Sequence, residues 1–437
     1  MSITRRNFLK TTAVAAMALP TIKVGALGAV AAGDKLNAAL IGCRNMGWGD
    51  LTDFLVNPDT ECVALCDIDA NVLNERAEEL VKMGRKKPDL YGDYRKMLER
   101  KDVDVVIIGT PDHWHCLQMV DACAAGKDVY VEKPAANSIA ECDAMTAAAK
   151  KYQRVVQVGQ QQRSSGHWKQ MVEYLRGGAL GTVGRVHIWG NFNYAAVPPK
   201  PDADVPAGVD FETWLGPTPA RTFNPQRFHG LWRMFWDYGG GLMTDWGVHL
   251  LDMGLWGLNV KEMPNKIVAT GGKFYYPEGM HETLDSQTVS YLFDDCIMSW
   301  EHNAGVQTGP YNRDYGVLFK GTNGTLVADR ENWEVIPEQD GNRGPKTPVM
   351  KIGADHQDHK IHLRNFIDCV KTRNFETACT IENGSLCAKY AHLGNIAARL
   401  NAALVYDDVA KSFVGAPEAN KYLKPAYRAP WKFPNIS

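Results

Sequence analysis

Between residues 36 and 159 the sequence alternates short apolar segments with longer amphipathic ones, and this alternation constrains the fold more than any other feature. Such alternation is typical of βαβ units, in which helices connect the parallel strands of one sheet. The apolar segments predict strands at residues 36–41, 61–67, 103–110, 128–132 and 154–159. The amphipathic segments predict helices at residues 71–83, 113–125 and 139–152. We therefore predict a doubly wound parallel sheet of the Rossmann type over residues 34–158.

The pattern changes after about residue 184, where polar and apolar residues alternate one by one, as in residues 185–189 and 288–293. Alternation with a period of two indicates a sheet that buries one face. A chain of 437 residues is also too long for one typical core. We therefore predict a second domain of the α+β type over residues 159–437, built on a large open and mostly antiparallel sheet.

Three segments of this second domain have a distinctive composition. Residues 198–219 are rich in Pro, Asp and Gly, which favours a long surface loop. Residues 384–400 show a helical pattern, and a Pro-rich tail follows them. We expect the tail to pack on the molecule as an extended arm.

The first 33 residues differ from the rest of the chain. They contain the pair Arg5-Arg6, then an Ala-rich stretch, then the small residues Ala29-Val30-Ala31. A positive start, a weakly apolar centre and an Ala-x-Ala site resemble a twin-arginine export signal, although a chance basic start before a helix is an alternative. The resemblance implies a signal peptide at residues 1–33 and export of the folded protein to the periplasm.

Composition excludes two classes of partner. The formal net charge is −2, and lysines and arginines form no cluster beyond the first residues. Nucleic acid is therefore not an expected partner, since such binding needs a basic surface. No other stretch has the 18 or more apolar residues that a membrane span requires, so we predict none.

Cysteine and histidine spacing gives little support for a metal or a disulfide framework. The ten cysteines are scattered without CxxC pairs, which is typical of small buried hydrophobic residues. His356, His359 and His362 are three residues apart, as metal ligands on a helix would be. They have no neighbouring set of Cys or acidic partners, so the interpretation is a polar helix face and no metal is predicted.

A glycine-containing loop follows the first predicted strand. A dinucleotide loop has glycines at its first, third and sixth positions, and Gly42 and Gly47 occupy two of these, whereas the third holds Arg44. The helix that begins here offers free N–H groups to a phosphate, so Gly42, Arg44, Asn45, Met46 and Gly47 are candidate cofactor contacts. The alternative is an ordinary strand-to-helix turn.

An acidic residue ends the second predicted strand. Asp67 lies about 25 residues after the loop, where a carboxylate accepts hydrogen bonds from the adenosine ribose, and it is a better candidate than Asp69 because it is nearer the strand end. A carboxylate repels a 2′-phosphate, so NAD is favoured over NADP. Because ligands bind beyond the carboxyl ends of parallel strands, the nicotinamide end is expected to be surrounded by Thr110, Pro111, His115, Glu132 and Lys133.

Three motifs together carry a resemblance to a known family. They are residues 109–115 (GTPDHWH), residues 132–134 (EKP) and residues 239–252 (GGGLMTDWGVHLLD). In this order they resemble the Gfo/Idh/MocA family of glucose–fructose oxidoreductase and inositol dehydrogenase, over nearly the whole chain after the signal segment. The resemblance implies a Rossmann domain that binds NAD, a sheet domain that covers the active site, and a homo-oligomer.

The resemblance also implies a catalytic set of Lys133, Asp245 and His249. Asp245 and His249 are four residues apart, so on a helix they share one face. His249 would accept the hydroxyl proton, Asp245 would orient the substrate or the imidazole, and Lys133 would polarise the reacting oxygen. Candidate substrate contacts are Arg163, Trp232, Arg233 and Trp246. Flat indole faces stack on sugar rings, although most tryptophans in a chain are core residues.

These features imply an enzyme that oxidises or reduces a hydroxyl of a sugar, glycoside or cyclitol with NAD. One alternative is a glycoside hydrolase with tightly bound NAD that works by oxidation at C3, elimination, hydration and re-reduction, because a periplasm holds little free NAD. Another is a non-catalytic sugar-binding module on a dehydrogenase fold, for which Arg44 in the loop is the best support.

Overall fold

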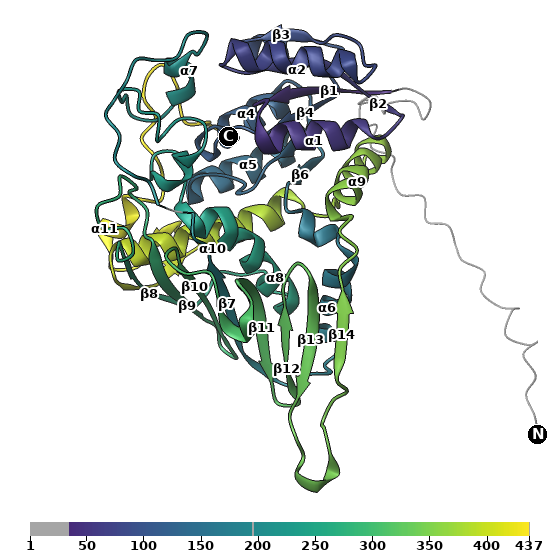
Figure 1. The fold of residues 1–437 in the computed structure, drawn as a ribbon, viewed down its shortest axis with the longest axis vertical. Helices are drawn as coiled ribbons and strands as arrows, with labels where there is room; N and C mark the ends of the chain where they lie inside the picture. The colour runs from purple at the N-terminus through teal and green to yellow at the C-terminus, as the bar shows by residue number, and fades with distance from the viewer. Residues whose placement is uncertain (1–34, 195, 437) are drawn as a thin grey trace, which may run out of the picture.

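The computed structural model describes residues 35–194 and 196–436, and it has two halves (Figure 1). The predicted twin-arginine segment, residues 1–33, lies outside the described residues. Among the described helices, none combines the length and the apolar character needed to cross a membrane.

The N-terminal half is a six-stranded parallel sheet in the order β3-β2-β1-β4-β5-β6, which confirms the predicted Rossmann topology. Helices cover both faces, so every residue of β4 and β5 is buried. The strands are β1 Leu36–Ile41, β2 Thr60–Cys66, β3 Asp89–Tyr91, β4 Val105–Ile108, β5 Asp128–Val131 and β6 Val156–Val158. The helices are α1 Asn45–Leu55, α2 Ala70–Lys82, α3 Tyr94–Leu98, α4 Asp112–Ala124 and α5 Ile139–Tyr152.

Strand β3 is not among the strands that the sequence predicts. It is an edge strand of three residues, none of them buried, so it has neither the length nor the apolar character of the other strands. Helix α5, by contrast, has a clear signal in the sequence. Ser138 caps it by accepting a hydrogen bond from the Glu141 backbone N–H at 3.2 Å. Such caps mark helix starts in the sequence.

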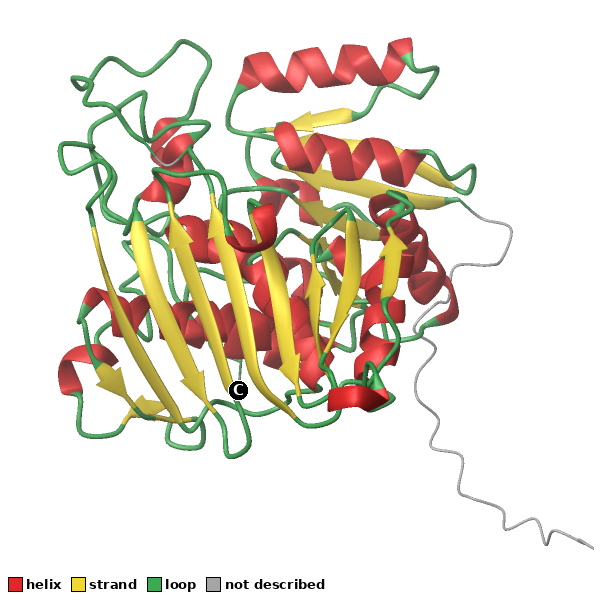
Figure 2. Ribbon diagram, turned by 60° about the horizontal axis from the view of Figure 1, so that its bottom comes forward, coloured by secondary structure: helices red, strands yellow, loops and turns green. Residues whose placement is uncertain are grey.

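The C-terminal half is built on a nine-stranded sheet in which only β7 and β10 pair in parallel (Figure 2). This confirms the predicted large, mostly antiparallel sheet. The strands are β7 Val183–Asn191, β8 Lys266–Gly272, β9 Ser286–Leu292, β10 Ile297–Asn303, β11 Tyr315–Gly321, β12 Gly324–Ala328, β13 Asn332–Pro337, β14 Met350–Gly353 and β15 Ala403–Leu404. A separate pair consists of β16 Tyr406–Asp407 and β17 Ser412–Phe413.

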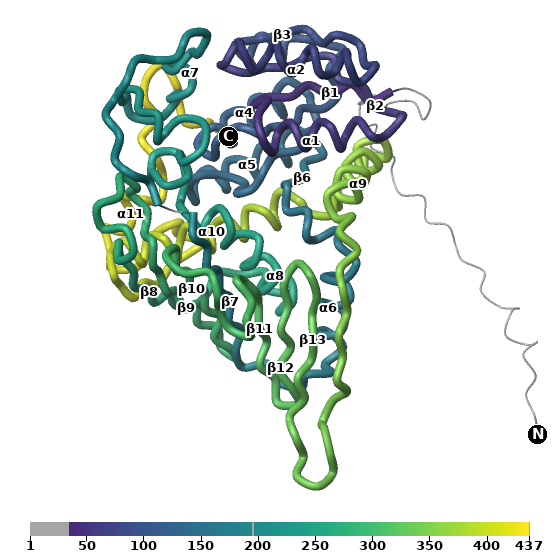
Figure 3. Tube along the Cα trace, in the orientation of Figure 1, coloured from purple at the N-terminus to yellow at the C-terminus, as the bar shows by residue number. Residues whose placement is uncertain are grey.

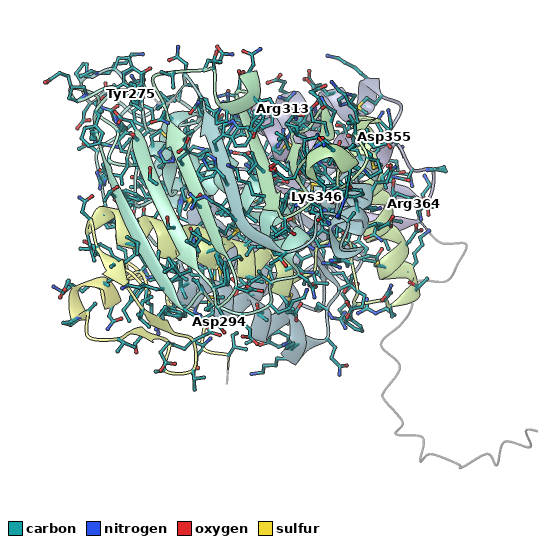
Figure 4. The ribbon with its side chains drawn as sticks, turned by 90° about the horizontal axis from the view of Figure 1, so that it is seen from below. Tyr275, Asp294, Arg313, Lys346, Asp355 and Arg364 are labelled. Atoms are coloured by element: carbon teal, nitrogen blue, oxygen red, sulfur yellow. The ribbon has the colours of Figure 1, made fainter. Side chains whose placement is uncertain are left out.

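One face of this sheet is covered by helices, and the other is open. The covering helices are α6 Gly166–Arg176, α8 Val248–Leu258 and α10 Ile381–Arg399, and between them and the sheet lie the fully buried rings of Trp168, Trp300 and Tyr291. The open face is seen from below in Figure 4, where Asp294 lies near one end of the strands and Arg313 near the other. It carries half-exposed apolar side chains such as Val268 and Ile297.

The remaining elements are short, apart from α9. They are η1 Gln161–Ser164, α7 Phe211–Leu215, η2 Leu231–Met234, η3 Met243–Gly247, η4 Pro310–Asn312, η5 Gly341–Arg343, α9 Asp358–Thr372 and α11 Pro417–Asn420. Helix α7 lies inside the predicted surface loop 198–219. That prediction was wrong for this part, because Phe211, Trp214 and Leu215 are buried in an aromatic cluster.

Two late segments of the chain return to the Rossmann half (Figure 3). Helix α9 packs on α1, and its residues Leu363, Phe366 and Ile367 belong to the same buried cluster as strand β1. The C-terminal tail packs near α4, where Trp431 meets Trp114 edge to face at 4.8 Å. The predicted extended arm is therefore confirmed.

The three spaced histidines do not form one polar helix face. His356 precedes α9 and is exposed, whereas His362 is fully buried and bonds Ser164 and the Val158 carbonyl at 2.8 and 2.9 Å. The polar-face interpretation was wrong for these two, since α9 turns its His362 side inward against the Rossmann sheet. All ten cysteines are buried, as predicted.

A buried ion pair joins the segment after β6 to helix α8. The Arg163 guanidinium donates to both carboxylate oxygens of Asp252 at 2.7 Å, and the exposed fractions of the two side chains are 8% and 1%. Removing one partner of such a pair leaves the other charge buried without compensation, which costs more than replacing both.

We therefore expect Asp252→Asn to lower the free energy of unfolding by about 3–5 kcal/mol. The double variant Arg163→Met/Asp252→Leu should lose clearly less, because no unpaired charge remains. Urea denaturation of the purified protein measures both. Glu99→Gln, in an exposed pair with Lys96, is the control and should leave stability nearly unchanged. Equal losses in the single and double variants would contradict this account.

Candidate active site

A cleft lies at the carboxyl ends of the Rossmann strands, where ligands bind in open parallel sheets. Its far wall comes from the second domain and includes Trp214, His229 and Trp232. Nine of the predicted cofactor contacts line it, namely Gly42, Arg44, Asn45, Met46, Asp67, Thr110, Pro111, Glu132 and Lys133. The cleft is thus formed by both halves of the chain.

The glycine loop after β1 has the geometry of a phosphate cradle. Gly42 has φ +86°, and a Cβ there would approach Gly109 and Thr110 backbone atoms to 2.8 Å. Gly47 is needed for packing, since a Cβ there would lie 2.2 Å from the Gly42 carbonyl oxygen. Gly47 does not line the cleft, so it acts behind the loop.

Arg44 replaces the usual second glycine without strain. Its φ is −108° and its ψ is 167°, an extended conformation that any residue adopts. It is the N-cap of α1 and makes no side-chain cap hydrogen bond, so the first N–H groups of α1 remain open toward the cleft. A helix N-terminus and an arginine at the cleft wall both suit a pyrophosphate.

Asp67 is fixed at the end of β2. Its carboxylate accepts hydrogen bonds from the backbone N–H of Cys43 at 2.7 Å and of Asp69 at 3.0 Å. Burial raises its pKa, and these N–H groups oppose the shift. Asp69 instead caps α2 and lies 3.2 Å from His229, so Asp67 is the acid that lines the cleft. These positions fit a dinucleotide with a ribose at Asp67.

Lys133 and Asp245 meet across the two domains. The Lys133 Nζ donates to Asp245 Oδ1 at 2.8 Å, and Arg233 Nε lies 3.2 Å from the same oxygen. The Tyr194 hydroxyl donates to Asp245 Oδ2 at 2.6 Å. Burial alone would raise the pKa of Asp245, but Lys133 and Arg233 outweigh it and hold that pKa well below its usual range. Asp245 is therefore a fixed anion.

His249 lies in the first turn of α8, just after a π-helical turn that carries Asp245. π-turns inside helices are common at functional sites. His249 is buried, and its Nδ1 has no hydrogen-bond partner among the described residues. Burial lowers the pKa of His249 well below its usual value, and Lys133 and Arg330 lower it further. A neutral imidazole beside the cluster is able to accept a proton.

Three other predicted contacts have different places. His115 is buried and bonds the carbonyls of Thr110 and Pro134 at 2.8 Å, so it joins the two strand-end loops. Arg163 is in the ion pair with Asp252 and does not line the cleft.

Trp246, predicted as a stacking platform for a sugar, already has partners. Phe192 stacks on its ring at 4.3 Å, and the Arg330 guanidinium lies over the ring at 4.5 Å. Two groups so close to the ring cannot share one face, so both faces are covered. By contrast Trp232 and Arg233 line the cleft, and the Arg233 guanidinium lies 4.2 Å from the Trp232 ring.

Several residues of the site are not predicted by the sequence. Tyr194 and Arg330 come from ordinary strand ends and turns, and no motif marks them. Asp112 lines the cleft and is buried, which raises its pKa to about 8. It lies inside the GTPDHWH motif, so its position next to Pro111 at the start of α4 was a usable signal.

Two models of one protein family match the two halves of the chain. The oxidoreductase family model with an NAD-binding Rossmann fold matches residues 36–160. The C-terminal alpha/beta domain model of the same family matches residues 182–276 and 346–433.

Solved structures share the fold over most of the chain. An aldose-aldose oxidoreductase from Caulobacter crescentus aligns with a TM-score of 0.64 and 20% identity, covering 85% of this chain and 99% of that one. A levoglucosan dehydrogenase in complex with NADH and levoglucosan aligns with a TM-score of 0.65 and 17% identity, with the same coverage.

Curated relatives match over a shorter segment. A glycosyl hydrolase family 109 protein from Shewanella baltica is 31% identical over 176 residues, which is 35% of this chain and 38% of that protein. An alpha-N-acetylgalactosaminidase from Shewanella oneidensis is 32% identical over 125 residues, 28% of this chain and 27% of that protein. Because both domain models of one family match in order, the chain belongs to the Gfo/Idh/MocA family of oxidoreductases, with an NAD-binding Rossmann domain.

Proposed function

We propose that this protein is an NAD-dependent oxidoreductase that acts on a hydroxyl of a sugar, glycoside or cyclitol. The observation that carries the proposal is the contact between Lys133 and Asp245 at 2.8 Å, beside a neutral His249 and at the wall of the dinucleotide cleft. Two structural neighbours are named for reactions of sugars, which supports a carbohydrate substrate.

When bound, NAD supplies the acceptor for a hydride from the carbon that bears the hydroxyl. The chain contributes the proton chemistry and the orientation. The Lys133 ammonium, held by Asp245, donates a hydrogen bond to the reacting oxygen. His249 accepts the hydroxyl proton, since its depressed pKa keeps the imidazole neutral. Tyr194 and Arg233 hold the Asp245 carboxylate in place.

We also propose that NAD stays bound between turnovers. The far wall of the cleft includes Thr213, Trp214, His229, Trp232 and Arg233, and the chain just before them is bonded to the Rossmann domain near Asp67. The Asp210 N–H donates to the Ile68 carbonyl at 2.8 Å, and the Ala70 N–H donates to the Gly208 carbonyl at 2.9 Å. His229, at the cleft wall, bonds Asp69 at 3.2 Å. A cofactor beneath these contacts leaves only when they open.

A second candidate function is glycoside hydrolysis with recycled NAD. The alignment with family 109 glycosyl hydrolases favours it. In that reaction oxidation at C3 acidifies the neighbouring C–H, the aglycone leaves by elimination, water adds, and the ketone is reduced again. The same Lys133, Asp245 and His249 serve both outcomes.

We further propose a cellular location and an oligomeric state for the protein. The twin-arginine resemblance of residues 1–33 supports export to the periplasm, where a retained cofactor is an advantage. The family resemblance supports a homo-oligomer, for which the open sheet face is the proposed interface. A non-catalytic sugar-binding module is the remaining alternative.

The cofactor prediction is tested by denaturing the purified protein and weighing the released small molecules by mass spectrometry. We expect close to one NAD per chain, because the bonds between the cleft wall and the Rossmann domain retain the cofactor. Asp69→Asn, which weakens the bond to His229, should lower this ratio, whereas Asp340→Asn on the distant exposed turn should not. Recovery of NADP, or of no dinucleotide from any preparation, would contradict the proposal.

The catalytic prediction concerns His249. We expect His249→Gln to reduce kcat about 10²- to 10⁴-fold, the usual contribution of a positioned proton-transfer group. A panel of aldoses, levoglucosan and inositols, followed by NADH absorbance, measures net oxidation. Release of p-nitrophenol from p-nitrophenyl α-N-acetylgalactosaminide without NADH, with solvent deuterium at C2, identifies the hydrolase instead. Ligand binding without any turnover indicates the binding module.

The pH dependence follows from the depressed pKa of His249. A base whose pKa is lowered stays neutral to lower pH, so kcat/KM should hold through pH 6.5, the usual histidine value, and fall only at more acidic pH. Rate measurements from pH 4.5 to 9 with the best substrate of the panel test this. A fall in kcat/KM centred at pH 6.5 that disappears only in His249→Gln would show that His249 titrates at its ordinary pKa, and this would contradict the burial argument.

A further inference from the structure

A second pocket, which shares no lining residue with the cofactor cleft, begins just after strand β6. Strand β6 pairs in parallel with β5, the strand that Lys133 follows, so the two segments after these strands start at the same edge of the sheet. The remaining walls come from the turn between β12 and β13, the start of α6 and the segment at the start of α9. The polar and charged residues of the lining include Gln161, His167, Arg330, Glu331, His356 and Asp358.

Arg330 in this pocket is a cation without an anionic partner. No carboxylate oxygen of the described residues lies within 4.0 Å of its guanidinium nitrogens. Its two chain neighbours have other partners, since Asp329 pairs with Arg313 at 2.9 Å and Glu331 lies 3.5 Å from His356. Burial lowers the pKa of Arg330, which reflects the cost of withdrawing this charge from water. Cations withdrawn from water are usually paired, so an anion from outside the chain is the expected partner.

Neutral groups hold the Arg330 guanidinium in a fixed orientation. The Arg330 Nε and Nη2 atoms donate to the side-chain oxygen of Gln162 at 2.9 and 3.0 Å, with the amide oriented to suit these donors. One face of the guanidinium lies over the Trp246 ring at 4.5 Å. Nη1 has no hydrogen-bond partner among the described residues. The edge formed by Nη1 and Nη2 is therefore available, and such an edge matches the two oxygens of a carboxylate.

Gln161 in the same pocket has a free acceptor. Its Oε1 atom is buried and has no hydrogen-bond partner among the residues that the structure describes. Buried polar atoms are almost always paired, so this oxygen points to a donor supplied by a ligand. A free acceptor beside an uncompensated cation suits a molecule that carries both hydroxyl groups and a negative charge.

The pocket adjoins the catalytic residues through Trp246. The Trp246 ring, which Arg330 covers, meets the His249 ring edge to face at 6.3 Å. One aromatic ring therefore separates the Arg330 guanidinium from the candidate proton acceptor. Trp246 also follows Asp245 directly in the π-helical turn. A group bound at Arg330 thus lies close to the place where the substrate hydroxyl reacts.

We propose that this pocket binds an anionic substituent of the substrate, so that Arg330 and Gln161 select an acidic sugar over its neutral counterpart. The proposal rests on the proposed oxidoreductase function and names its substrate class. Arg330 donates to the anion through Nη1 and Nη2, and Gln161 accepts a hydrogen bond from a sugar hydroxyl. The carboxylate of a uronate and the sulfate of a sugar sulfate ester share this chemistry.

Two carboxylates of the lining oppose an anion. Glu331 is at the mouth, because its side chain is 66% exposed and faces the exposed His356. In Figure 4, Asp355, the chain neighbour of His356, lies near the edge of the molecule. Asp358 is partly buried, and its charge acts on Arg330 from beyond 4.0 Å. Replacing Asp358 should therefore strengthen the binding of an anion.

The binding test uses calorimetry on the NAD-loaded protein without turnover. The ligands are glucose, galactose and mannose, each paired with its uronate and its 6-sulfate. We expect at least one acidic member to bind more tightly than its neutral counterpart. Arg330→Gln should weaken that acidic member about 10- to 100-fold, the usual effect of hydrogen bonds to a charged group, and the neutral one less than about twofold. Comparison of uronate with sulfate identifies the anion.

Three further variants separate this effect from general damage. Asp358→Asn should tighten the acidic ligand, and Arg330→Lys should give an intermediate affinity, because it keeps the charge but loses the planar fork. Arg343→Gln removes an exposed cation from a distant turn and is the control, which should bind like the parent protein. The melting temperature of Arg330→Gln should not fall below that of the control, since Arg330 has no ion pair to lose.

The inference is overturned if no acidic sugar binds, if acidic and neutral members bind equally, or if Arg330→Gln weakens both alike. These outcomes are separate from the fate of the proposed function. Oxidation of neutral sugars with no preference for acidic ones leaves the oxidoreductase function intact and removes the anion pocket. Binding of an acidic sugar that depends on Arg330, without NADH or aglycone release, establishes the pocket and contradicts the oxidoreductase function.

Discussion

A carboxylate that is mostly withdrawn from water stays ionised only where cations and hydrogen-bond donors surround it, and Asp245, whose side chain is 15% exposed, has such partners from both domains. Lys133 comes from the end of β5 in the Rossmann domain, and Arg233 and Tyr194 come from the sheet domain. The relative position of the two domains therefore decides whether this charge is compensated. The same contact places the candidate proton-transfer groups beside the dinucleotide cleft.

The surrounding fold supports this contact from several sides. Helix α8 carries His249 and is tied to the segment after β6 by the pair of Arg163 and Asp252. Helix α9 and the C-terminal tail cross back to the Rossmann domain and pack into its core clusters. The segment that forms the outer cleft wall is bonded to the start of α2. Besides the contact of Lys133 with Asp245, the two domains are thus joined through α9, the C-terminal tail and the segment before the outer cleft wall.

Some residues of the site can be predicted from the sequence, and others cannot. Gly42, Asp67, Lys133 and Asp245 follow strand ends or lie in motifs, so their approximate places were predictable. Tyr194 reaches the same carboxylate from a position that carries no motif. Trp246 and Arg163 are residue types that suit sugar binding. However, Trp246 packs against Phe192 and Arg330, and Arg163 pairs with Asp252.

The sequence by itself determined the two sheets, the glycine loop and the order of the motifs, because these depend on local periodicity and on backbone geometry that only certain residues allow. The tertiary structure decided which side chains converge. His359 and Asp50 are 309 residues apart in the chain and yet lie 2.9 Å apart, because α9 docks on α1. Such contacts arise from the packing of whole helices and strands, so they cannot be predicted from the local sequence.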